Sequence, residues 1–252
     1  MIQSVKLFRI FIIAFFAALI VVGVKHTFHK LGWEMIEQSS LHNSVISSVT
    51  FVIGFILSAT IADYKESERI PADFAANLED MYEDAKAIHS NYKVFDLDGF
   101  RKQLHTIGVG FDKDARKKSY DASKDIRQLN SFFTAMETGG IPANFIVKLK
   151  QQQTSLLRNR HRVEYIQRIK FIPSASILAR SIVGMVLILL VLTNIDPFYG
   201  GLAITGVITF ILVYMLVLIN IISTPFHASG KTRDDVSLFL INDAVKYLAK
   251  KD

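Results

Sequence analysis

The sequence contains no cysteine among its 252 residues. Disulfide bonds, thiolate catalysis and cysteine-bound zinc are therefore excluded. It also lacks a phosphate-binding glycine loop, a nucleophile elbow and a metal-binding helix motif, and its seven histidines are scattered. We therefore expect a protein that is not an enzyme, with no catalytic residues, no metal site and no cofactor.

Apolar and charged residues are both abundant. Half of the residues are hydrophobic and 21% are charged, with a net charge of +6. This mixture is typical of a membrane protein with a sizeable soluble part. Lysine and arginine collect on the cytoplasmic side of such proteins, which explains the positive charge without nucleic acid. Because no nucleic-acid motif accompanies the charge, no nucleic-acid partner is expected.

Four apolar segments are each long enough to cross a bilayer, which takes about 20 helical residues. They cover residues 5–24, 42–64, 173–193 and 199–222. The long segment between the second and third spans is charged and has a helical pattern. The sequence therefore predicts an all-α membrane protein with a helical cytoplasmic insert. The expected domains are residues 1–64 (spans one and two), 65–172 (insert), 173–223 (spans three and four) and 224–252 (tail helix).

An even number of spans places both termini on the same side of the membrane. The insert and the tail are rich in lysine and arginine, whereas the two outer connections are short. The positive-inside bias therefore predicts a multi-pass protein of the plasma or inner membrane with both termini in the cytoplasm. Trp33, the only tryptophan, is suited to anchor the chain at the bilayer interface.

One face of the second span is too polar for contact with lipid alone. At helical steps of three and four residues, this serine–phenylalanine face comprises Ser44, Ser47, Ser48, Phe51, Phe55 and Ser58. It could line a polar path that Phe51 and Phe55 narrow one turn apart. It could also be a seam between helices, because small and hydroxyl residues let membrane helices approach closely. The stretch by itself slightly favours the seam.

A cation lies inside the third span. Arg180 is about 10 Å from the start of that helix at 1.5 Å per residue. A charge at this depth is costly and normally finds a partner or water. Asp63, near the inner end of the second span, is a candidate partner, and snorkelling of Arg180 to the inner interface is the equally weighted alternative.

The insert has three local signals. Pro71 predicts the start of a helix. Asp96 and Asp98 before Gly99 resemble the beginning of a calcium loop, but the later ligands are missing, so a turn and a helix cap are the favoured interpretation. The helix expected over residues 143–170 carries many cations, which predicts a solvated face, contact with lipid head groups or a wall that attracts anions.

Three short motifs, in this order, resemble those of the bestrophins, a family of ion channels, and especially their shorter prokaryotic relatives. The second span contains TFVIGF over residues 50–55, similar to the family motif of an aromatic, two aliphatics, glycine and an aromatic. Ile172-Pro173 opens the third span, and Thr224-Pro225-Phe226 follows the fourth, where the family has asparagine-proline-phenylalanine. The order of the spans and the helical insert also agree with the family.

The resemblance implies a homopentamer in the lipid bilayer, with the second helix of each subunit lining a narrow neck that passes small inorganic ions. It makes pore lining the favoured interpretation of the serine–phenylalanine face. Phe51 and Phe55 match the family's aromatic rings, whereas Ser47 replaces its outermost apolar ring and predicts a wetter outer neck. The residues expected to have structural or coupling roles are Gly54, Asp63, Pro173, Arg180, Pro225 and Phe226.

The expected function is passive conduction of chloride or other small anions. Phenylalanine edges are weakly positive and suit a partly dehydrated anion. The alternatives are a cation-conducting member of the same fold and a scaffold or stator-like subunit that needs a partner. The calcium-regulated members carry a run of acids after the proline-phenylalanine pair, but residues 227–235 begin with HASGKTR, so calcium gating is not expected.

Overall fold

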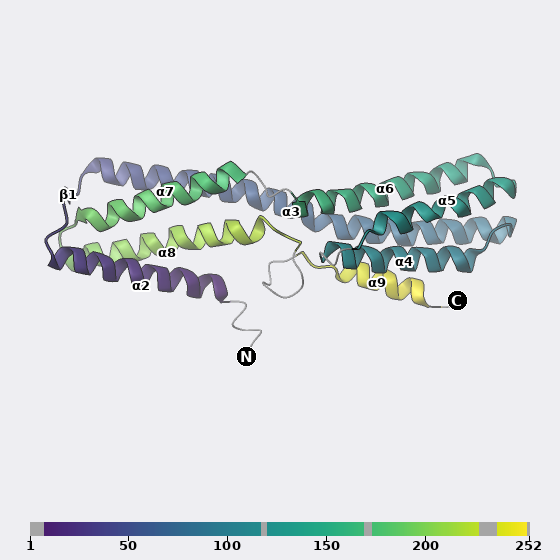
Figure 1. Ribbon diagram of the computed structural model, residues 1–252. Coiled ribbons are helices and arrows are strands. Elements are labelled where there is room, and N and C mark those ends of the chain that lie inside the picture. Colours follow the sequence, from purple (N-terminus) through teal and green to yellow (C-terminus); the bar gives the residue numbers. More distant parts are fainter. Residues whose placement is uncertain (1–7, 117–119, 169–172, 227–235, 251–252) are drawn as a thin grey trace. The chain divides into compact units, whose positions relative to one another are not determined.

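The computed structural model describes residues 8–116, 120–168, 173–226 and 236–250. Its helices fall into two compact units. One unit contains α2 (Arg9–Lys30), α7 (Pro173–Leu192), α8 (Phe198–Ile222) and the first part of α3 (Ser40–Tyr92). The other contains the rest of α3 with α4 (Leu97–Ala115), α5 (Ala122–Thr138), α6 (Ala143–Arg168) and α9 (Phe239–Ala249) (Figure 1).

The first unit is a bundle of helices (Figure 1), and its spans are apolar. Among the described residues, four helices are long and apolar enough to cross a membrane, and each overlaps one of the four predicted spans. Ile53 of α3 is fully buried in a cluster with side chains of α7 and α8, including Val183 and Leu212. The predicted fold class, an all-α membrane protein with a helical insert between spans two and three, is confirmed.

The short connections at one end of this bundle are joined by backbone pairing. β1 (Ile36–Glu37) and β2 (Thr193–Asn194) form a parallel pair of two-residue strands. The first lies between α2 and α3, and the second lies between α7 and α8. The sequence predicted only polar connections here, because two-residue strands leave no periodic pattern.

The end of the first span differs from the prediction. The sequence placed the first span at residues 5–24 with a polar connection after it, whereas α2 continues to Lys30 and Lys25 is only 1% exposed. Its ammonium group is satisfied by hydrogen bonds, described below, so the helix can carry the charge into the bundle.

The second unit is a soluble-type helical bundle with a core of large side chains. Phe74 of α3 stacks on Phe111 of α4 with ring centroids 3.9 Å apart. Leu129 of α5 and Leu156 of α6 are also fully buried. The apolar residues recur at helical spacing, which is why each amphipathic helix packs one face into this core.

Pro71 does not open a helix, so that prediction is wrong. It lies inside α3, which runs as one helix from Ser40 to Tyr92. Proline lacks the N–H group for one helical hydrogen bond and therefore weakens a helix interior. The neighbouring side chains of Ile70 and Phe74 are buried, and this packing stabilises the helical turn despite the proline.

The predicted cap is confirmed. The side chain of Asp96 accepts a hydrogen bond from the backbone N–H of Gly99 at 2.9 Å, and α4 begins at Leu97. A carboxylate in this position satisfies one of the free N–H groups of the first turn. Among the described residues, no cluster of metal-ligating side chains forms around this turn.

Several cations of α6 are paired with carboxylates of neighbouring helices. Lys148 lies 2.7 Å from Asp84 of α3, and Arg162 lies 2.7 Å from Glu66 of α3. Arg160 is buried and its Nε donates to Asp114 at 2.8 Å. These pairs connect α6 to its neighbours, so these three cations contribute less free positive potential than the sequence suggested.

The tail helix α9 is held by an arginine of α4. Arg101 Nη1 donates to the backbone carbonyls of Leu248 at 2.6 Å and Lys250 at 3.2 Å, where α9 ends. Its Nη2 also donates to Asp98, 2.6 Å away. Hydrogen bonds from Lys102 and Arg101 lower the pKa of the exposed Asp98 carboxyl to about 2. Arg101 therefore remains paired and satisfies carbonyls that the helix end leaves free.

Replacing Arg101 by methionine is expected to loosen α9. Hydrogen bonds from a charged group contribute about 1.5–3 kcal/mol, so amide hydrogen exchange in α9 should accelerate roughly 10- to 100-fold. Mass spectrometry of exchanged peptides measures this change. Lys102→Met is the control, because it removes an exposed cation that pairs with the same Asp98 but is not a hydrogen-bond donor to the carbonyls at the end of α9. Equal protection of α9 from exchange in both variants would contradict the proposed stabilisation of α9 by the Arg101 hydrogen bonds.

Candidate functional site

The aliphatic face of the second span packs inside its own chain. Ile53 is fully buried, and Ile46, Val49, Ile56 and Leu57 are partly buried against the same α7–α8 cluster. This packing fixes the rotation of α3 in the bundle, because one face of the helix is occupied by α7 and α8.

Most of the serine–phenylalanine face consequently points away from that cluster, and Phe55 also borders a cavity that Ile219 of the cluster lines. All six side chains of the face are exposed in the single chain. Phe51 is 76% exposed and Phe55 is 70% exposed. Ser44 Oγ donates to the carbonyl of Ser40 at 3.0 Å within the same helix. Other helices of the same chain therefore leave this face uncovered, and both pore lining and a seam with helices of another copy remain predictions.

Among the spans, α3 is the least covered by its own chain. Only 11% of the residues in its most apolar window are buried, against 22% in α2, 28% in α7 and 22% in α8. A largely exposed span with a row of hydroxyl groups is poorly suited to lipid, which offers no polar contacts. Water or further copies of the chain are the environments that suit this face.

Gly54 lies within this span without a close neighbour. A Cβ added there would meet no atom within 4 Å. No contact inside one chain therefore requires glycine at this position. The predicted structural role of Gly54 remains a prediction, and any close approach there would involve another copy of the chain.

The polar end of the second span borders a small cavity. Asp63 lines a space of about 140 Å³ together with Ser176 of α7 and Ser223 at the end of α8. Arg180 Nη2 donates to Asn220 Oδ1 of α8 at 3.1 Å. Asn220 is thus a partner that sequence analysis missed, because a lone asparagine in an apolar segment carries no pairing signal. This hydrogen bond satisfies part of the hydrogen-bonding capacity of the Arg180 guanidinium, which lies inside the third span.

The motif prolines lie at helix boundaries. α7 begins at Pro173, as its sequence predicts. Pro225 and Phe226 are buried just after α8 ends at Ile222, and the Pro225 carbonyl accepts from the N–H of Val236 at 3.0 Å. The connection whose acidity bears on calcium gating, residues 227–235, lies outside the described residues.

A buried lysine network holds the opposite end of the bundle. Lys25 Nζ donates to the carbonyls of Leu190 at 3.0 Å and Thr193 at 2.6 Å, at the C-terminal end of α7. It also donates to Glu34 at 3.0 Å. The ammonium thus caps α7 and complements the negative end of its dipole.

His29 completes this network from the last turn of α2. Its Nδ1 lies 2.7 Å from Glu34, and its ring stacks on Phe198 of α8 with centroids 3.8 Å apart. Burial raises the pKa of Glu34, but hydrogen bonds from His29 and Lys25 outweigh it, so the pKa lies below its ordinary value. Glu34 is therefore ionised at neutral pH and balances the Lys25 charge.

Comparison with known proteins identifies the architecture. No sequence family matches the chain, and no curated protein matches it. A variant of a bestrophin homologue from Klebsiella pneumoniae matches with a TM-score of 0.72 at 14% identity, covering 96% of this chain and 97% of that one. This chain has the bestrophin fold.

Two further solved structures match over a similar share of the chain. The same Klebsiella pneumoniae homologue, solved by zinc phasing, matches with a TM-score of 0.72 at 14% identity over 96% of both chains. A variant described as a membrane protein matches with a TM-score of 0.74 at 13% identity, again over 96% of both chains. The likeness that three short motifs indicated is therefore confirmed for the fold.

Proposed function

We propose that copies of this chain assemble around a central axis and form a passive ion channel whose pore is lined by the serine–phenylalanine face. The observation that carries this proposal is the exposure of that whole face in a membrane-spanning helix whose opposite face is packed. Hydroxyl groups facing a water-filled path are solvated, whereas in lipid their partners would be limited to carbonyls of their own helix, such as the bond from Ser44 to Ser40.

Self-association follows from the same exposure. The bestrophin resemblance implies five copies, with the second span of each nearest the axis. Five copies would place Phe51 and Phe55 in two rings one helical turn apart. Such apolar rings can gate a pore by dewetting, and the serine rows on either side would keep the approaches wet.

The conducted ion is proposed to be chloride or another small anion. The edges of phenylalanine rings carry partial positive charge, which favours a partly dehydrated anion. Lysine and arginine also outnumber aspartate and glutamate, at 29 against 23 residues. We place the chain in the plasma or inner membrane with both termini in the cytoplasm, because the cation-rich segments flank that side of the spans.

The selectivity is tested by the reversal potential of the purified protein in a planar bilayer under asymmetric potassium chloride. With a tenfold gradient of potassium chloride, the equilibrium potentials of chloride and potassium have opposite signs and a magnitude of about 59 mV each. We expect reversal near the chloride value, with detergent-only bilayers as the control. Reversal near the potassium value would keep the channel and reverse its selectivity.

The channel itself is tested by the same preparation. A verified oligomer that carries no protein-dependent current and copurifies with a stoichiometric small membrane protein would instead indicate a scaffold or stator-like subunit. Such a subunit needs a partner helix with an ionisable residue inside the ring.

A further inference from the structure

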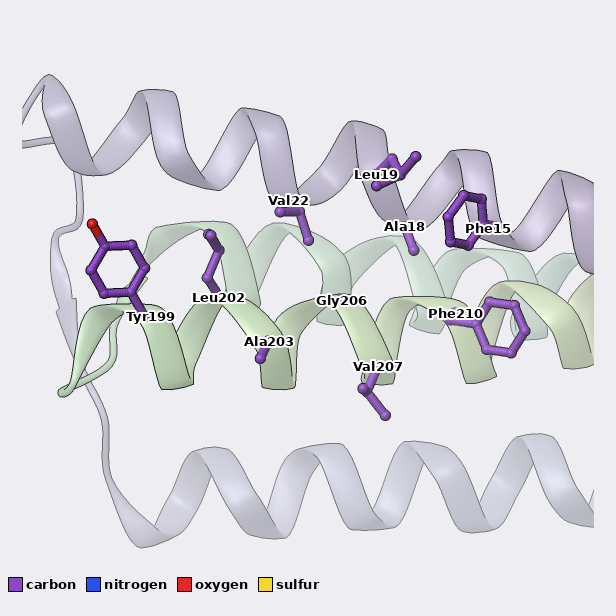
Figure 2. A pocket seen from close by; sticks show the side chains of 10 residues that line it. All are labelled: Phe15, Ala18, Leu19, Val22, Tyr199, Leu202, Ala203, Gly206, Val207 and Phe210. Carbon is purple, nitrogen blue, oxygen red and sulfur yellow. The ribbon is translucent and has the colours of Figure 1, made fainter.

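The membrane-spanning unit contains a second feature that the channel proposal does not use. A groove of about 450 Å³ lies between α2 and α8. Figure 2 shows its lining side chains, which come from both helices and end at Tyr199. Apart from the Tyr199 hydroxyl, every side chain of the lining is apolar.

Small residues create the hollow. Ala18 lies on the α2 wall, and Ala203 and Gly206 lie on the α8 wall. Gly206 brings α8 close to α2, because an added Cβ would come within 3.1 Å of Val22 Cγ2. Phe15 and Phe210 lie toward the other end of the groove, away from Tyr199. The helices thus pack tightly at Gly206 and leave open space beside it.

The length of the groove matches one leaflet of a bilayer. On α8 it extends from Tyr199 to Phe210, which is about 16 Å at 1.5 Å per residue. Half of the hydrocarbon core is about 15 Å. Both walls belong to helices able to span the membrane, so the groove opens where acyl chains are the surrounding medium.

The polar end of the groove lies where a lipid becomes polar. Tyr199 is the second residue of α8, at the end of the bundle that carries the short connections, and it is exposed. A tyrosine at the bilayer interface keeps its ring in the apolar region and its hydroxyl among polar groups. An amphipathic ligand with a polar end at Tyr199 and an apolar tail toward Phe210 therefore fits the lining.

We propose that this groove binds one acyl chain of a membrane phospholipid, from the leaflet at the end of the bundle with the short connections. The acyl chain fills the space that the small residues leave, and the Tyr199 hydroxyl lies level with the ester and head-group region. The bound chain covers apolar surface of α2 and α8 together and so contributes to their packing.

The test uses the full-length protein in nanodiscs of palmitoyl-oleoyl phosphatidylcholine that contain a fraction of the same lipid with a diazirine on its acyl chain. After photolysis, mass spectrometry maps the labelled residues. Leu19 and Val207 line the groove, whereas Ile20 and Ile204 are comparably exposed neighbours that do not. We expect several-fold more label on the groove residue of each pair.

Filling the groove supplies the decisive comparison. Ala203→Phe places a ring in the open space, and Ile204→Phe places the same ring on the neighbouring exposed position. The ring removes the packing contacts that hold the acyl chain in the groove, so labelling of Leu19 should fall several-fold. The control should leave that labelling unchanged. Val207→Phe replaces the first variant if Ala203→Phe does not fold.

Three results would overturn the proposal. Equal labelling within each pair would show only the ordinary lipid shell. Protection of Leu19 and Val207 relative to their neighbours would show that another protein surface covers the groove. Unchanged labelling of Leu19 in the folded filling variant would show that the acyl chain lies elsewhere.

Discussion

Replacing Phe51 and Phe55 together by alanine is expected to raise the single-channel current about tenfold and to remove prolonged closures. In the proposed oligomer, these side chains form the apolar rings that an ion must pass. Removing only about 1.4 kcal/mol from that barrier would multiply the transit rate by ten. Alanine also widens the path and keeps it wet, so discrimination between anions of different size should weaken. Planar-bilayer recordings measure all three effects.

Phe16→Ala is the matched control for this pair. Phe16 is also a highly exposed phenylalanine in a membrane span, but it belongs to α2. Its replacement should leave current, closures and anion discrimination unchanged. An assembled Phe51→Ala, Phe55→Ala protein with wild-type conductance, gating and selectivity would refute the assignment of these residues to the neck.

Replacing Lys25 by methionine is expected to destabilise the protein more than either of the two comparison variants described below. The change leaves the Glu34 carboxylate in a buried position without its ammonium partner and uncaps two carbonyls at the end of α7. Removing one member of a buried charge pair typically costs about 3–5 kcal/mol. The midpoint of thermal unfolding in detergent should fall by roughly 10 °C. Circular dichroism at a fixed heating rate measures the shift.

Two further variants separate the buried pair from a general effect of charge. Lys30→Met removes an exposed lysine of the same helix and should shift the midpoint by less than about 2 °C. Lys25→Met combined with Glu34→Gln also removes the stranded carboxylate, so it should recover part of the loss. A Lys25→Met protein as stable as Lys30→Met would contradict the network.

The spans were predictable because hydropathy and length depend on composition along one segment. Pro173 and Asp96 likewise gave correct helix starts, since proline at a first turn and aspartate at a cap act locally. Pro71 gave a wrong helix start, because buried neighbours from elsewhere in the chain override its local preference. The burial of Lys25 beyond the predicted span was not predictable for a related reason: its partners at Leu190 and Thr193 are about 165 residues away, beyond any local pattern.

The candidate site was only partly predictable. Helical periodicity was sufficient to group Ser47, Phe51 and Phe55 on one face, since it depends on spacing alone. The direction in which this face points could not be predicted from spacing. It depends on the packing of Ile53 against α7 and α8, which turns most of the face away from the rest of its own chain. The groove beside Gly206 left no sequence signal, because small residues in an apolar helix are equally typical of close helix packing.

The absence of native cysteine permits a direct test of the central claim that the serine–phenylalanine face lines the pore. Ser47→Cys and Ser58→Cys would be treated with a charged thiol reagent that does not cross membranes, during recording from the oligomer in a planar bilayer. Ile188→Cys, on an exposed apolar position of α7, is the control. We expect both serine positions to react and alter the current while Ile188→Cys does not. Current that flows normally while Ser47→Cys and Ser58→Cys remain as unreactive as Ile188→Cys would contradict the central claim.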